Sequence, residues 1–154
     1  MLSVELVPKT SWGDNLRSRF KPAEWDALRF ACYAAAGHKC EVCGGVGKKH
    51  PVECHEIWHY DDENHVQTLQ SLVALCPACH EVKHFGRAQA TGNGARALNH
   101  LARVNGWTDA QAKAHVEAAF IVWRKRSQSN WTLDLSKVEV KSLPRPVEGD
   151  LFLP

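Results

Sequence analysis

The chain of 154 residues has neither a marked excess of one charge nor a long apolar run. Its 19 lysines and arginines nearly balance its 17 aspartates and glutamates, so the formal net charge is only +2, with nine histidines left out of that count. This is at most a weak indication of an anionic partner. No stretch approaches the roughly 20 apolar residues that span a bilayer. We therefore expect no membrane partner.

The beginning of the chain also lacks the features of an export signal. Residues 1–8 have neither a basic region nor an apolar core, and no internal repeat is evident. The length suits one compact domain with a terminal extension, and a hydrophobic content of 44% is normal for a globular protein with a real core. We expect a cytoplasmic protein.

Six cysteines stand out against this ordinary composition. In an exported chain they would suggest three disulfides, but without an export signal two Cys-x-x-Cys pairs favour zinc in a reducing compartment. Such pairs reach a tetrahedral zinc ion from tight turns. The predicted structural zinc ligands are Cys40, Cys43, Cys76 and Cys79. The two cysteines outside this pattern are Cys32, interpreted as a small buried side chain, and Cys54.

The second cysteine pair leads directly into two histidines. His80 and His84 are four residues apart on an expected helix, so they project from one face and suit a divalent metal. His55 lies in an alternating stretch expected to form a strand against that helix, where an imidazole serves as a general base or as a ligand. The alternative is a hydrogen-bonded core histidine. Glu53 and Glu56 argue against it, because carboxylates and imidazoles are costly to bury together without a metal or charge partner.

The remaining histidines lie outside this group, and we interpret them as solvent-exposed side chains: His38, His50, His59, His65, His100 and His115.

The pattern of apolar residues and breakers predicts an α+β fold. The expected strands cover residues 2–7, 52–58, 69–75 and 131–135, and the expected helices cover 22–36, 77–85, 95–104 and 109–127. Pairing of 131–135 with 2–7 would bring the termini together. The predicted organisation is an N-terminal strand and helix over 1–37, a metal-binding domain over 38–90, C-terminal helices and a strand over 91–142, and a tail over 143–154.

Residues 40–84 resemble an HNH endonuclease domain of the zinc-bearing kind. The resemblance rests on both cysteine pairs, on the stretches 52–57 and 72–76, and on His80 and His84. The flanking sequence also resembles uncharacterised bacterial and phage HNH proteins. The resemblance implies a ββα-metal core stapled by a four-cysteine zinc site, with flanking helices. It also implies metal-dependent hydrolysis of phosphodiester bonds in DNA, with magnesium, manganese or nickel as the catalytic ion.

In that family a histidine on the first strand activates water and a histidine on the helix binds the metal, so the resemblance implies metal ligation by His80 and His84. The first strand usually carries a ligand followed by the base. Here two registers are open. In one, His55 is the base and Cys54 replaces the ligand; in the other, His55 is the ligand and Glu56 occupies the base position.

The chain also departs from the family at the middle position, where an asparagine usually orients the base through its amide. The aligned residue here is Ser71, with Gln67 and Gln70 nearby. Serine or glutamine would take over this orienting role.

A nuclease must also hold a polyanion, mainly through lysine and arginine. The candidates for DNA contact near the motif are Lys48, Lys49, Lys83 and Arg87. We interpret the basic run 124–126 as favourable placement at the negative end of a helix dipole. The leading hypothesis is a metal-dependent DNA endonuclease. The alternatives are a zinc-stapled nucleic-acid-binding protein without catalysis and a non-catalytic interaction module.

Overall fold

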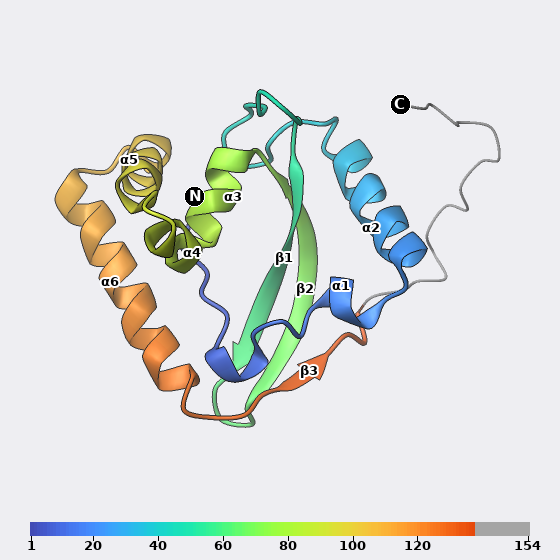
Figure 1. Ribbon diagram of the computed structural model, residues 1–154. Helices are drawn as coiled ribbons and strands as arrows, with labels where there is room; N and C mark the ends of the chain where they lie inside the picture. Colours follow the sequence, from blue (N-terminus) through green and yellow to red (C-terminus); the bar gives the residue numbers. More distant parts are fainter. Residues whose placement is uncertain (138–154) are drawn as a thin grey trace.

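The computed structural model describes residues 1–137 of an α+β protein, in which helices lie on both sides of a small sheet (Figure 1). The expected tail over 143–154 lies outside the described residues. The strands are β1 (Glu53–Asp61), β2 (Val66–Leu75) and β3 (Thr132–Asp134). The helices are α1 (Leu16–Arg19), α2 (Pro22–Ala35), α3 (Pro77–Lys83), α4 (Phe85–Ala90), α5 (Gly94–Asn105) and α6 (Asp109–Arg126), with a 3-10 turn at Lys9–Ser11.

A long hairpin forms the centre of the molecule. β1 and β2 pair antiparallel from Glu53 opposite Leu75 to Asp61 opposite Val66. The turn is closed by Asp61, whose Oδ1 accepts the backbone N–H of Asn64 at 3.0 Å. The two strands confirm the predicted hairpin, although both are longer than expected and their connection is correspondingly shorter.

The prediction of a first strand over residues 2–7 is wrong. This segment is extended but does not join the sheet, and β3 pairs in parallel with β2 instead. Its backbone N–H groups are satisfied by scattered partners. The N–H of Leu2 donates to Asn105 Oδ1 at 2.8 Å, that of Val4 to His115 Nε2 at 3.0 Å, and that of Glu5 to the Lys83 carbonyl at 3.1 Å. The alternation of apolar and polar residues in this segment therefore reflects the alternate burial of its side chains and not pairing with a strand.

The expected helices are present, with one interruption. The predicted helix over 77–85 ends at Lys83, because His84 leaves helical geometry at φ −92° and ψ 44°, and α4 starts at the next residue. Helix α6 begins as predicted, with the side chain of Thr108 accepting the N–H of Gln111 at 3.2 Å. Helix α5 stops at Gly106, whose left-handed φ of 65° suits glycine.

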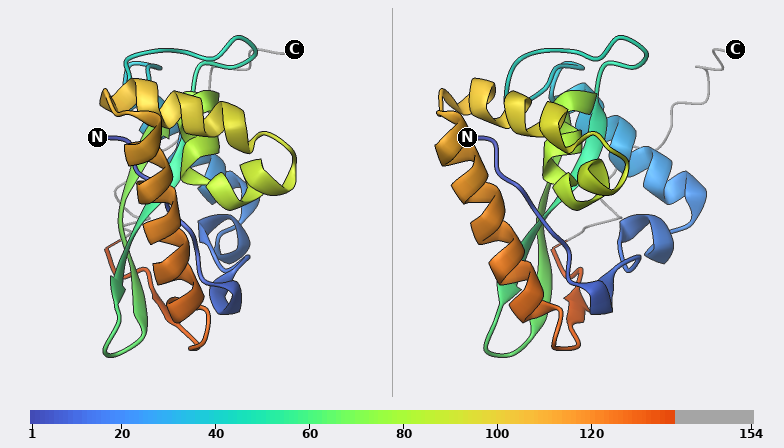
Figure 2. Two further views of the ribbon diagram at one scale, coloured as in Figure 1. Left: turned by 90° about the vertical axis from the view of Figure 1, so that its left-hand side faces the viewer. Right: turned by 60° about the vertical axis from the view of Figure 1, so that its left-hand side comes forward.

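Helices α3 to α6 lie on one side of the hairpin and helices α1 and α2 on the other (Figures 1 and 2), and each group covers an apolar cluster. The larger joins the N-terminal segment to α3, α4, α5 and α6, with Leu2, Leu75 and Leu101 fully buried. The smaller lies beneath α1 and α2 around Leu16 and Leu69. The hairpin is thus packed against helices on both of its faces, so the side chains of each face point towards a different cluster.

Among the described residues, no helix has both the length and the apolar character of a membrane-spanning segment.

Candidate metal centres and active site

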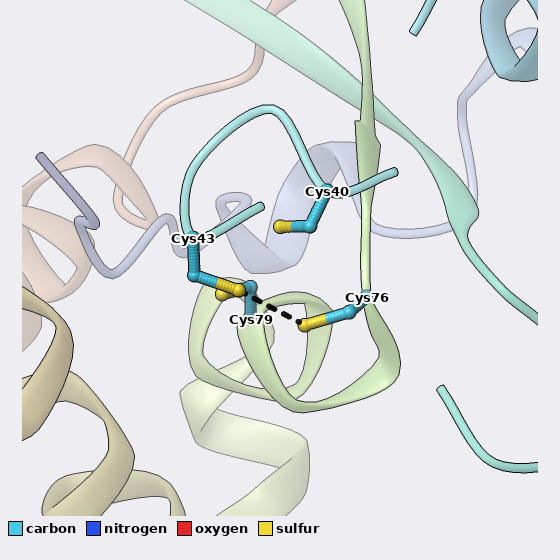
Figure 3. A group of neighbouring side chains, drawn as sticks. All are labelled: Cys40, Cys43, Cys76 and Cys79. Carbon is cyan, nitrogen blue, oxygen red and sulfur yellow. Dashed lines mark hydrogen bonds between the residues drawn. The ribbon is translucent and has the colours of Figure 1, made fainter. Parts of the chain in front are cut away.

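Four cysteines converge where the loop before β1 meets the start of α3 (Figure 3). Their sulfur atoms, which belong to Cys40, Cys43, Cys76 and Cys79, all lie within 4.8 Å of one another. The Cys43 and Cys76 sulfurs are 3.6 Å apart, and all four are free thiols. Zinc–sulfur bonds of about 2.3 Å in a tetrahedron put sulfur atoms about 3.8 Å apart. The arrangement therefore fits one structural zinc ion, as predicted.

The loop that carries the first pair is a tight turn. The N–H of Gly44 donates to the Cys40 carbonyl at 2.8 Å, and the N–H of Cys40 donates to the Gly45 carbonyl at 3.0 Å. Gly44 has a φ of 72°, which side-chain-bearing residues rarely adopt. Burial raises the pKa of the Cys40 thiol, but hydrogen bonds from the backbone of Cys43, Cys76 and Val42 outweigh it and lower that pKa to about 7. These backbone groups thus favour the thiolate form of Cys40, the form that zinc requires, whereas burial raises the pKa of the Cys76 and Cys79 thiols.

His100 supports this site from helix α5, so its interpretation as a solvent-exposed residue is wrong. Its Nε2 is 3.2 Å from the Cys79 sulfur, while its Nδ1 accepts from Arg103 Nη2 at 2.9 Å. Because Nδ1 accepts, Nε2 carries the proton and donates to sulfur. Such outer contacts orient metal ligands. Local sequence gives no signal for a contact between residues 79 and 100.

Three histidines form a second cluster. His55 on β1 and His80 and His84 from α3 present nitrogen atoms within 4.8 Å of one another. The Nε2 atoms of His80 and His84 are 3.1 Å apart, and the His55 ring centre is 4.9 Å from that of His84. Burial and the neighbouring imidazoles lower the pKa of His84 to about 3, and burial lowers the pKa of His55. Both rings are therefore neutral at neutral pH, the form that binds metals or accepts a proton.

Two carboxylates hold this cluster from outside. Glu53 contacts Nδ1 of His80 and also lies 2.7 Å from His50 Nε2, and its hydrogen bond with His80 is the main reason that its pKa falls to about 2. Glu5 Oε2 lies 3.1 Å from His55 Nε2. The interpretation of His50 as a purely solvated residue therefore needs correction. Glu5 was not predicted, because it precedes His55 by 50 residues.

The other candidates on the two strands lie away from the histidines. Neighbouring residues of a strand point to opposite faces, and Glu56 accordingly accepts the N–H of Leu16 at 2.9 Å on the α1 side. Cys54 points the same way, towards Cys32, where the hydrogen bond with that second thiol, together with burial, raises its pKa. Ser71 is exposed. The structure thus brings together His55, His80 and His84, and leaves Glu56, Cys54 and Ser71 outside their cluster.

The expected phosphate contacts divide into two groups. Lys48, Lys49 and Arg87 are exposed. Lys83 is only 5% exposed, and its Nζ lies 2.5 Å from Glu5 and 3.0 Å from Ser3. The prediction of a surface phosphate contact is wrong for Lys83, because its ammonium group is buried and binds the Glu5 and Ser3 side chains.

A groove of about 1510 Å³ opens over the histidine cluster. All three histidines line it, together with the N-terminal segment and parts of α4 and α6. Basic side chains at its wall are Lys9, Arg17, Arg87 and Arg126. The cluster is thus accessible to a large ligand, whereas His55 itself is only 6% exposed.

No protein-family model, no curated protein and no solved structure matches this chain. The resemblance of residues 40–84 to a known domain remains a hypothesis.

Proposed function

We propose that the protein is a metal-dependent endonuclease that hydrolyses phosphodiester bonds in DNA, with β1, β2 and α3 as an HNH-type ββα-metal core. The observation that carries the proposal is the convergence of His55, His80 and His84 at the wall of a large groove. A protein that only binds nucleic acid through a zinc-stabilised fold needs no second group of metal-binding residues such as these three histidines. The groove is also bordered by basic side chains, which suit a polyanion.

His80 and His84 would hold the catalytic ion. His80 lies within α3 and His84 directly follows the helix, four residues further on, and Glu53 on Nδ1 of His80 leaves its Nε2 facing His84. A bound divalent ion supplies electrostatic stabilisation of the charge that develops on the phosphate and the leaving oxygen. Imidazole donors suit nickel better than magnesium, and manganese is the intermediate case.

His55 would act as the general base. It is buried, its lowered pKa leaves it neutral, and it therefore can accept a proton from an attacking water. The competing register assigns that role to Glu56, but the Glu56 carboxylate is engaged with the Leu16 N–H on the other side of the strand. These contacts favour His55 as the base, and Cys54 contacts Cys32 instead of the other two histidines.

Nicking of supercoiled plasmid DNA tests the proposal. We expect cleavage by the wild type with nickel or manganese, and loss of cleavage by about 100-fold or more in His55→Ala, since general base catalysis typically contributes 10²–10⁴-fold. Metal affinity should change little in His55→Ala and fall sharply in His84→Ala. His59→Ala is the matched control, because His59 is an exposed histidine on the same strand.

Two outcomes would overturn parts of this assignment. A large loss of metal affinity in His55→Ala would make His55 a ligand instead of the base. DNA binding without cleavage in the presence of magnesium, manganese or nickel would favour the alternative, a zinc-stapled nucleic-acid-binding protein.

A further inference from the structure

We propose that Glu5, which lies 50 residues before His55 in the chain, is a positioning residue that orients the His55 imidazole for proton transfer. The inference rests on the proposed function of the histidine cluster and adds a residue to it. Glu5 belongs to an extended N-terminal segment that lines the groove, where no local motif marks it.

The contacts of Glu5 fix its carboxylate at both oxygens. Oε2 lies 3.1 Å from His55 Nε2, and Oε1 lies 2.5 Å from the Nζ of Lys83. The backbone around it is fixed as well, since the N–H of Glu5 donates to the Lys83 carbonyl at 3.1 Å and that of Val4 donates to His115 at 3.0 Å. The carboxylate therefore has a defined place beside the imidazole.

This arrangement determines which nitrogen of His55 carries the proton. Burial raises the pKa of Glu5, but the hydrogen bond with His55 and the charge of Lys83 outweigh it, so the pKa is lowered and the group is an anion. An ionised carboxylate only accepts hydrogen bonds, so Nε2 of His55 must donate. The free lone pair is then on Nδ1, as in catalytic dyads in which a carboxylate orients a histidine base.

Glu5 is a partner of His55 and not a further member of the donor cluster. Within residues 1–137, the group whose donor atoms lie within 4.8 Å of one another consists of His55, His80 and His84, without Glu5. Glu53 stands in the same relation to His80. Two imidazoles of the cluster are thus each held by one carboxylate, one from the strand and one from the N-terminal segment.

The competing explanation is that Glu5 merely joins the N-terminal segment to α3 through Lys83. That explanation predicts a loss of stability after substitution but no specific effect on the His55 ring. The two explanations differ in the tautomer of His55 and in the coupling between the two residues.

The first test needs no catalysis. Ring ¹⁵N chemical shifts of the zinc-loaded full chain should show His55 protonated at Nε2 and unprotonated at Nδ1. In Glu5→Gln, which keeps the shape of the side chain, the amide can still accept through its oxygen, so the same tautomer should persist. In Glu5→Ala the ring should become a mixture of tautomers. A proton on Nδ1 in the wild type, or an unchanged tautomer in Glu5→Ala, would overturn the proposal.

The second test measures coupling in plasmid nicking. Glu5→Ala should reduce kcat by about 10- to 100-fold, the range typical of outer contacts that orient metal-binding histidines, and Glu5→Gln should recover part of that loss. KM and metal affinity should stay within about twofold of the wild-type values, because both carboxylate oxygens of Glu5 are engaged by His55 and Lys83 and not by a ligand of the groove. In a His55→Ala background the same substitutions should have no further effect. Glu63→Gln, on the exposed hairpin turn, is the charge-matched control.

Failure of the two ideas can be told apart. If the wild type does not cleave DNA, the proposed function fails, while the ¹⁵N experiment still decides whether Glu5 orients His55. If the wild type cleaves but Glu5→Ala lowers the rate equally with and without His55, Glu5 has only a structural role and the positioning proposal fails.

Discussion

Lys83 carries a positive charge into an almost fully buried position, 5% exposed. A buried ammonium group is costly unless it is paired. Here the Glu5 carboxylate and the Ser3 hydroxyl are its partners, at 2.5 Å and 3.0 Å. Glu5 is therefore the counter-charge of a buried ammonium group as well as the neighbour of His55.

This dependence gives a prediction about stability. Glu5→Ala should lower the free energy of unfolding by about 2–4 kcal/mol, because it leaves Lys83 buried without its counter-charge. The double substitution Glu5→Ala/Lys83→Met should be less destabilising than Glu5→Ala alone, since an apolar side chain of similar length removes the unpaired charge. Urea denaturation of the wild type, both single variants and the double variant measures the coupling. Additive losses would show that the ion pair does not govern stability.

Gln67 is a second polar side chain in an apolar position. It is fully buried, and neither its Oε1 nor its Nε2 has a hydrogen-bond partner among residues 1–137. Unpaired buried polar groups typically cost about 1–3 kcal/mol. We expect Gln67→Met, which has nearly the same shape, to raise the free energy of unfolding by about 1 kcal/mol. Chemical denaturation would reveal the change, and a loss of stability would mean that the amide is satisfied in solution.

At the scale of the elements, the four-cysteine site and the three-histidine cluster are neighbours but differ in what they contribute to folding. The four cysteines join a loop to the hairpin end, so a metal there contributes folding energy. The histidines lie on elements that the core already holds in place. His84 directly follows the end of α3, and the neighbouring Phe85 is buried in the larger apolar cluster.

We therefore predict that Cys76→Ala unfolds the central unit, whereas His84→Ala leaves the fold largely intact. Thermal melting should show a loss of the cooperative transition in Cys76→Ala and a change of only a few degrees in His84→Ala. Metal analysis of the wild type should give about one tightly bound zinc per chain. Similar large losses in both variants would mean that the two groups of ligands do not have separate roles.

Elements whose signals are local could be predicted from the sequence. The hairpin strands follow from alternation, α2 and α6 from their apolar spacing and start residues, and the cysteine site from the two Cys-x-x-Cys pairs. The contacts of Glu5 with His55 and of His100 with Cys79 could not be predicted, because they join residues 50 and 21 positions apart. The segment 2–7 was misassigned because alternate burial of Leu2 and Val4 produces the same pattern with or without strand pairing.

At the scale of the whole molecule, the N-terminal segment connects helices α5 and α6 to the histidine cluster. Leu2 and Val4 are buried in the larger cluster, and Leu2 is held by Asn105 of α5 at both its N–H and its carbonyl. Trp123 of α6 donates to the carbonyl of Val7 at 3.0 Å. The segment thus connects α5, α6 and the histidine cluster, although terminal residues of most domains contribute little.

Deletion of residues 2–7 should consequently destabilise the whole protein and not merely shorten it. Burial of one leucine or valine side chain contributes about 1.5–3 kcal/mol, so loss of Leu2 and Val4 alone should lower the free energy of unfolding by about 3–6 kcal/mol. Leu2→Ala, which removes one of these side chains and leaves Glu5 in place, should lose about half as much while cleavage of DNA is retained. Urea denaturation and plasmid nicking measured on the same preparations separate the two effects. Near-native stability of the deletion variant would show that the segment is not part of the folded core.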